Sequence, residues 1–177
     1  MGANGSVTDS CFGQVFLVLS DVLGKTQCAE TRLGAVAALH ALITHCTHAF
    51  ENYLNVGVQA LLEAYVTGPD SGAHNVAAGV VSALNDLLAA LPVARSFDVL
   101  TPLVLTSTKS SVLCLAIRLL STAVARAAPK VLFTQLRAFL PGLLDAFQNP
   151  STDVRKAVVF TLVEAYMVLG ESLMPCL

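Results

Sequence analysis

Residues 151–170 read STDVRKAVVFTLVEAYMVLG, and this stretch shows most directly how the chain folds. Its apolar residues recur at steps of three and four, which places them on one face of a helix. They are Val154, Val158, Leu162, Ala165 and Leu169. A second apolar set covers another face: Val159, Phe160, Val163 and Met167. A helix that is apolar on two sides is expected to be sandwiched between neighbours.

The same helical period runs through most of the chain, whereas no sustained period-two alternation predicts strands. Turn residues at 24–26, 68–72, 106–111 and 149–152 divide the apolar stretches into pairs. We therefore expect an all-α chain with helices near residues 8–23, 28–46, 52–66, 72–91, 96–106, 111–127, 130–148 and 152–169. Pro102 and Pro141 fall inside two of these helices and are expected to bend them.

The spacing of the helix pairs indicates a repeat protein. The second helices start about 40 residues apart, which is the period of HEAT and armadillo arrays, and two helices per period favour HEAT. The sequence thus predicts one domain over 1–177, an α-α superhelix (solenoid) of about four helical hairpins. The repeats are expected near 8–46, 52–91, 96–127 and 130–169. Arg32 aligns with Arg155 at an offset of 123 residues, or three periods of 41.

Polar residues at the expected boundaries predict helix caps. Ser151 or Thr152 is expected to cap the last helix, with Asp153 in its first turn favouring the helix dipole. Ser110 or Ser111 is expected to do the same for the helix near 111–127.

Composition narrows the class of protein. Apolar residues make up 55% of the chain and charged residues 12%, which suits a packed core and excludes disorder. A net charge of −2 argues against nucleic-acid binding and against a polybasic membrane-surface role. The cysteines are odd in number and lack a C-x-x-C pair, so reduced thiols are expected rather than a disulfide framework. They are Cys11, Cys28, Cys46, Cys114 and Cys176.

No membrane span or secretory signal is expected. The most membrane-like stretch, residues 76–94, carries Asp86 near its middle, where an acid costs about 2.5–3.5 kcal/mol on an insertion scale. Gly2 to Ser6 matches the loose myristoylation pattern, although the same residues are typical of any flexible leader.

Motifs for metal binding and catalysis are weak. His40, His45, Cys46 and His48 form the one cluster resembling a metal site, but no acid or second cysteine lies near in sequence to complete it. Histidines near a helix C-terminus also suit the dipole, so no metal or other cofactor is expected. Nucleophile elbows, phosphate loops and H-E-x-x-H are absent from the sequence, which predicts a protein that is not an enzyme.

The loops inside each repeat are the best candidates for binding, because in a solenoid they fall along one edge. That edge would carry Lys25, Asp70, Lys109, Asp153, Arg155 and Lys156. Spaced cations could grip an acidic partner protein. The alternative is that these charges only keep the turns soluble.

Residues 136–177 read LRAFLPGLLDAFQNPSTDVRKAVVFTLVEAYMVLGESLMPCL. The segment 140–144, the polar turn 149–152, Val154-Arg155-Lys156-Ala157 and the step from 169–171 to Leu173-x-Pro175 carry a resemblance. The segment resembles the last HEAT repeats of the CLASP proteins, the cytoplasmic linker-associated proteins. The remaining residues fit that family by helix pattern only.

The resemblance implies a microtubule-associated regulator of the cytoplasm and cytoskeleton, acting at plus ends, kinetochores and the mitotic spindle. In that family TOG domains bind tubulin through the loop edge, whereas a C-terminal helical domain docks plus-end linker proteins and kinetochore motors. About four repeats rather than six, and residues 24–26 with no Trp in the chain, favour the C-terminal docking domain. A TOG-like tubulin binder and a HEAT adaptor scaffold unrelated to microtubules remain alternatives. Residues 174–177 resemble the start of another helix, so a fragment of a longer protein is expected.

Overall fold

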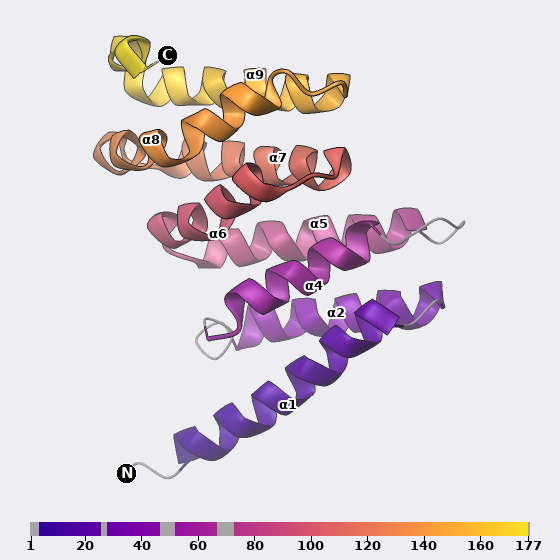
Figure 1. The fold of residues 1–177 in the computed structure, drawn as a ribbon. Helices are drawn as coiled ribbons and strands as arrows, with labels where there is room; N and C mark the ends of the chain where they lie inside the picture. The colour runs from indigo at the N-terminus through magenta and orange to yellow at the C-terminus, as the bar shows by residue number, and fades with distance from the viewer. Residues whose placement is uncertain (1–3, 26–27, 47–51, 67–72, 177) are drawn as a thin grey trace. The chain divides into compact units, whose positions relative to one another are not determined.

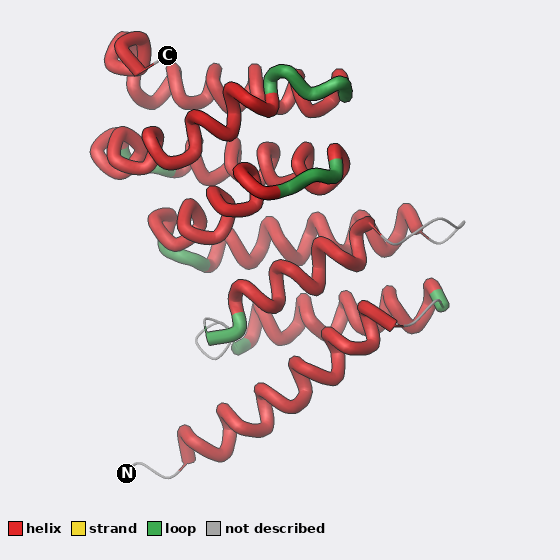
Figure 2. The backbone as a smooth tube through the Cα atoms, viewed as in Figure 1, coloured by secondary structure: helices red, strands yellow, loops and turns green. Residues whose placement is uncertain are grey.

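The structure is a computed structural model that describes residues 4–25, 28–46, 52–66 and 73–176. Within these ranges the chain is helical and contains no strand, which confirms the predicted all-α class (Figures 1 and 2). The elements are α1 (Asn4–Lys25), α2 (Ala29–His45), α4 (Leu54–Val66), α5 (Ala73–Ala90), α6 (Val93–Thr106), α7 (Ser110–Arg126), α8 (Pro129–Ala146), α9 (Thr152–Leu169) and the 3-10 helix η1 (Gly170–Cys176). These bounds agree with the expected ranges to within a few residues. Gly2, His48 and Asp70, three residues named above, lie outside the described ranges.

The chain divides into two compact units, residues 1–90 (the first unit) and 91–177 (the second unit). In the first unit α1 packs on α2 and α4, while α5 packs on α2 and α4. In the second unit α6 packs on α7 and α8, α9 packs on α7 and α8, and η1 packs on α9. In each unit, therefore, the second helix of one pair lies against the second helix of the other pair (Figure 1).

The second helices α2, α5, α7 and α9 repeat one pattern of inward-facing positions at i, i+3, i+4, i+7 and i+11. In α2 these are Arg32, Ala35, Val36, Leu39 and Ile43, and in α9 they are Val154, Ala157, Val158, Thr161 and Ala165. In α7 they are Leu113, Ala116, Ile117, Leu120 and Val124, and in α5 they are Val76, Gly79, Val80, Ala83 and Leu87, of which only Gly79 is half-buried. The side chains at these positions pack against the neighbouring helices and form the core of each layer.

This pattern corrects the predicted register by one residue. The buried faces align Arg32 with Val154, not with Arg155. The sequence alignment matched these two residues because both are arginines. A shift of one residue turns a side chain by about 100° around the helix axis, so Arg155 does not occupy the inward position that Arg32 does.

The expectation that α9 is sandwiched on both apolar faces is wrong for the part of the chain that the structure describes. Its neighbours α7, α8 and η1 cover the face that carries Val154 and Val158. The second apolar set stays exposed: Val159 is 45%, Phe160 67%, Val163 52% and Met167 77% exposed.

The N-cap position predicted for α9 is confirmed, but its capping hydrogen bond is absent, and the serine cap predicted for α7 is wrong. Ser151 does stand at the N-cap of α9, but its side chain makes no capping hydrogen bond. Lys109, rather than a serine, occupies the N-cap of α7. The side chain of Asn149 organises the turn instead: its Oδ1 accepts hydrogen bonds from the Ser151 N–H (2.9 Å) and from the Ser110 hydroxyl (3.2 Å). The turn before α9 is thereby tied to the start of α7.

Among the described residues one stretch, Thr152–Pro175, is long and apolar enough to cross a membrane by length and composition. The stretch singled out from the sequence, near 76–94, contains only a shorter apolar helix. Core helices of soluble proteins pass the same test, and one face of α9 is packed against α7 and α8.

Candidate docking groove

The residues predicted to form a binding edge are divided between the two units. Lys25 ends α1 in the first unit, where its Nζ lies 2.5 Å from the Asp21 carboxylate, with both side chains exposed. Lys109, Asp153, Arg155 and Lys156 all belong to the second unit, at the ends of α7 and α9 where the turns inside each repeat lie.

Arg155 is occupied by its own turn. Its guanidinium donates hydrogen bonds to the carbonyls of Asn149 (2.7 Å) and Pro150 (2.9 Å) and to the Thr152 hydroxyl (3.3 Å). These carbonyls follow the end of α8, where acceptors lack helical partners. Arg155 therefore stabilises the turn between α8 and α9 and is not directed outward.

Asp153 and Lys156 line a groove of about 500 Å³ between α7 and α9. The α7 wall consists of Arg118, Ser121, Thr122 and Ala125, and the α9 wall consists of Asp153, Lys156, Ala157, Phe160 and Glu164. Ala157 is the one buried residue of the lining, and the Phe160 side chain, three residues further along α9, is 67% exposed. An exposed aromatic ring in a groove suits the apolar anchor of a partner protein.

Charges of both signs line the end of the groove nearest the turns, where the exposed Asp153 lies with two cations. Lys156 and Arg118 are exposed there, and Lys109 is exposed at the start of α7. Burial raises the pKa of the Cys114 thiol, while the nearby Arg118 lowers that pKa and Asp153 raises it. The charges of Arg118 and Asp153 therefore lie close enough to the Cys114 thiol to change its pKa.

The second unit as a whole is basic. It holds eight Lys and Arg against five Asp and Glu, a formal charge of +3, whereas the first unit holds two against seven, a formal charge of −5. The chain's net charge of −2 conceals this difference. A basic surface favours and steers an acidic partner.

Sequence reasoning missed Arg118, Phe160 and Glu164, because it looked for binding residues only in turns. All three lie about two to three turns inside α7 or α9, on the side of the groove. Phe160 carried a signal, since it belongs to the second apolar face of α9, but that face was interpreted as core.

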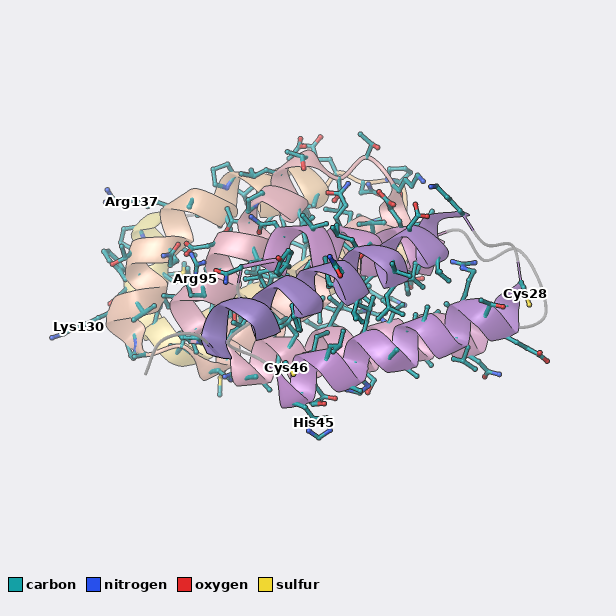
Figure 3. All side chains as sticks on the ribbon, turned by 90° about the horizontal axis from the view of Figure 1, so that it is seen from below. Cys28, His45, Cys46, Arg95, Lys130 and Arg137 are labelled. Carbon is teal, nitrogen blue, oxygen red and sulfur yellow. The ribbon has the colours of Figure 1, made fainter. Side chains whose placement is uncertain are left out.

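Of the predicted histidine and cysteine cluster the structure describes His40, His45 and Cys46, and these three do not converge. His40 Nε2 lies 2.6 Å from Asp86 Oδ2, across from α2 to α5. Figure 3 shows His45 pointing away from the body of the protein, and Cys28 and Cys46 at opposite ends of α2. Within the described residues no group of three or more His, Cys, Asp or Glu could hold a metal ion. Cys28, Cys46 and Cys114 are free thiols.

The chain is similar to known proteins over nearly its whole length. It is 28% identical over 172 residues to "CLIP-associated protein" of Arabidopsis thaliana, covering 97% of this chain and 12% of that protein. It is 30% identical over 174 residues to "CLIP-associating protein 1-B" of Xenopus laevis, covering 98% and 12%, respectively. It is 30% identical over 172 residues to "CLIP-associating protein 1" of Xenopus tropicalis, covering 97% and 11%. No family model matches the chain.

A solved structure shares the fold. It comes from work on the structural basis of microtubule plus-end tracking by XMAP215, CLIP-170 and EB1, and it covers 93% of this chain and 67% of its own, with a TM-score of 0.76 and 20% identity. The chain spans about 12% of the length of the sequence relatives that it matches. These matches confirm the resemblance carried by residues 136–177: over the segment that it covers, the chain belongs to the CLIP-associating protein family.

Proposed function

We propose that this chain is a non-catalytic protein-binding domain of a microtubule-associated regulator, a HEAT-type solenoid of about four hairpins that docks partners at the α7–α9 groove. The observation that carries the proposal is the exposed Phe160 ring beside Arg118 and Lys156, in a unit of charge +3. An apolar anchor next to cations suits an acidic, partly apolar segment of another protein.

The names of the relatives suggest the class of partner. A protein called CLIP-associating binds a CLIP, so a plus-end linker protein is the first partner to test. Kinetochore motors are a second candidate class, and the cytoskeleton, at microtubules, spindle and kinetochore, is the proposed location. This assignment corresponds to the C-terminal docking domain of the family.

Among the predicted edge residues, Lys109, Asp153 and Lys156 belong to the proposed site. Lys156 and Asp153 line the groove, and Lys109 stands at the N-cap of α7. Arg155 contributes by holding the turn before α9. Lys25 is assigned no part in this site, because it lies in the first unit beside Asp21.

Binding of a CLIP linker protein, measured by pull-down and isothermal titration calorimetry, tests the proposal. Phe160→Ser should weaken the complex, whereas Phe133→Ser should not, because Phe133 is an exposed Phe (42%) on α8 outside the groove. Arg137 and Lys130, which project from α8 in Figure 3, provide matched control cations for Arg118 and Lys156. Equal losses from groove and control variants would place the docking site elsewhere.

Direct tubulin binding, as in a TOG domain, is the alternative favoured by the fold match to a chain studied in microtubule plus-end tracking. Gel filtration with unpolymerised tubulin separates the two. A complex at about 30 μM, corresponding to a free energy near −6 kcal/mol, would favour the tubulin alternative. No complex with either tubulin or a CLIP would favour an adaptor scaffold unrelated to microtubules.

A further inference from the structure

The groove between α7 and α9 has a direction, because both of its walls begin at the same end. Asn149 Oδ1 accepts a hydrogen bond from the Ser110 hydroxyl, which ties the turn before α9 to the start of α7. Further along, the Thr161 hydroxyl donates a hydrogen bond to the Ile117 carbonyl (3.3 Å). The two helices therefore run side by side in the same direction, as Figure 1 shows.

The α9 wall presents a row of side chains with the spacing of one helix face. The residues of this row that carry a charge or a ring follow one another at steps of three, four and four. They are Asp153, Lys156, Phe160 and Glu164. At about 1.5 Å per residue the row is about 16 Å long, or about three helical turns.

Arg118 on the α7 wall stands near the middle of this row. It lies five positions after the first inward residue of α7, whereas Lys156 and Phe160 lie two and six positions after the first inward residue of α9. From the turn end, the groove thus presents an acid, two cations, an aromatic ring and a second acid. Among the described residues, none forms an ion pair with these four charged side chains, so a partner can meet them.

We propose that the groove receives an amphipathic α-helix of the partner protein, an inference that rests on the proposed docking function of this site. The contact face of that helix carries a base, an acid, an apolar residue and a second base at steps of four, three and four. The first base then lies at the level of Asp153 and the second at the level of Glu164. The acid lies between the two cations, and the apolar residue lies on the Phe160 ring. Each charge of the groove thereby meets its opposite.

The length of the row selects a helix over an extended segment. Alternate side chains of an extended segment point the same way at intervals of about 6.6 Å, so about three of them reach the groove over about 16 Å. A helix presents four, because steps of four, three and four keep its side chains on one face. A helix lying in a groove with anchors at this spacing is a general mode of recognition.

The helix dipoles select the direction of the bound helix. Both walls begin at the turn end, so the positive ends of their dipoles lie there. They favour the C-terminal, negative end of the partner helix at the same place. Read from its N-terminus, the contact face is therefore base, apolar residue, acid, base, and its N-terminal base meets Glu164.

Fluorescence anisotropy of a labelled peptide, titrated with the 177-residue chain, tests the proposal. The probe is an alanine-based helix of about 18 residues with Lys, Leu, Glu and Lys at steps of four, three and four from its N-terminus. We expect a Kd of about 100 μM. A control peptide carries the same side chains in the reverse order, so its composition and net charge are unchanged. It should bind at least about 5-fold more weakly.

Two further variants test the contacts and the helical form. Glu164→Lys should weaken binding of the first peptide by about 3- to 10-fold, and replacing the N-terminal Lys of the peptide by Glu should restore the affinity to within about 2-fold. Circular dichroism checks that this variant keeps its helices. A peptide with prolines between the four contact residues cannot form the helix and should bind at least about 10-fold more weakly.

Three outcomes overturn the proposal: a reversed peptide that binds as tightly, a proline peptide that binds as tightly, or a Glu164→Lys loss that the exchanged peptide does not restore. Failure of the helix inference is distinguishable from failure of the proposed function. If a CLIP linker protein binds through Phe160 while no helical peptide binds at about 1 mM, the docking site stands and the helix is rejected. If neither binds through Phe160, both are rejected.

Discussion

The α2–α5 layer of the first unit and the α7–α9 layer of the second are built on the same inward positions and differ on the groove side. When residues are counted from the first inward position of each helix, Arg118 of α7 corresponds to Ala37 of α2. In the same way, Lys156 and Phe160 of α9 correspond to Ala78 and Ser82 of α5. Ser121 and Glu164 correspond to His40 and Asp86, whose side chains meet at 2.6 Å and join α2 to α5. In the first unit these positions are small or joined across the layer by the His40–Asp86 contact, whereas in the second unit they include two cations, an acid and an exposed aromatic ring. One repeat pattern therefore builds both cores, while the outward positions differ, and it is these outward positions that would let the α7–α9 layer bind the proposed partner.

The largest effect is expected where the two inward patterns differ most, at Arg32 and Val154. Arg32 is 5% exposed and donates a buried hydrogen bond of 2.5 Å from Nη2 to the Ala64 carbonyl on α4. Arg32→Val, which copies Val154, removes a charged donor and leaves that carbonyl without it. The free energy of unfolding should fall by about 2–3 kcal/mol in urea titrations followed by circular dichroism.

Arg155→Val is the control that distinguishes the two registers. Arg155 bonds the turn carbonyls from a part-buried to exposed position, so its loss should cost about 0.5–1.5 kcal/mol. Equal losses for the two variants would contradict the burial register and support the alignment of Arg32 with Arg155. Native-state hydrogen exchange locates each loss in its own unit.

The helices were predictable because turn residues and apolar periodicity are local signals. Thr152–Leu169 begins and ends as expected from the turn at 149–152 and from Gly170. The exact rotation of each helix was not predictable, because it depends on which face meets a neighbour. That is why Arg32 was matched to the wrong residue and the exposed face of α9 was taken for core.

The proposed site was predictable only in part, for the same reason. Lys109, Asp153 and Lys156 were identified because charges near repeat turns are visible in the sequence. Arg118 and Phe160 were not, since their role depends on α7 and α9 lying side by side. The direction of the Arg155 side chain, toward Asn149 and Pro150, likewise follows from the folded turn.

Giving Phe160 the residue of its first-unit counterpart is expected to have the largest effect on binding. Phe160→Ser, which copies Ser82, removes the ring from the groove and should weaken binding of a CLIP linker protein by about 10- to 50-fold. Because Phe160 is 67% exposed, stability in urea should change by less than about 0.5 kcal/mol. Calorimetry measures the affinity, and Phe133→Ser is the matched control. A loss of stability as large as the loss of affinity would mean that Phe160 serves packing instead.

The cations of the groove are expected to contribute less. Arg118→Ala with Lys156→Ala copies Ala37 and Ala78 and should weaken the same complex by about 3- to 10-fold at low salt. The difference from the parent should shrink in 0.5 M salt, where exposed charges are screened. The control is the double variant Lys130→Ala with Arg137→Ala on α8, which has the same net charge as the groove double variant. It should have little effect on the affinity for the CLIP linker protein. If that control weakens binding as much, the overall charge of the second unit acts rather than the groove.

The smallest effect is expected in the alkylation rates of two cysteines, one in each layer. They are Cys28, before α2, and Cys114, in α7. The Thr31 hydroxyl, followed by the backbone N–H groups of Thr31 and Glu30, lowers the pKa of the exposed Cys28 thiol. Burial raises the pKa of Cys114, and Arg118 opposes that increase.

Because the thiolate is the reactive form, Cys28 should be alkylated faster than Cys114 at neutral pH, and the rate of Cys28 should level off at a lower pH than that of Cys114. Thr31→Ala should slow Cys28 by about two- to five-fold, and Arg118→Ala should slow Cys114 without changing Cys28. Iodoacetamide labelling followed by peptide mass spectrometry across pH 6–10 measures both rates. If Arg118→Ala leaves the alkylation rate of Cys114 unchanged, the guanidinium does not face the thiol. The proposed arrangement of charges at the turn end of the groove would then need to be revised.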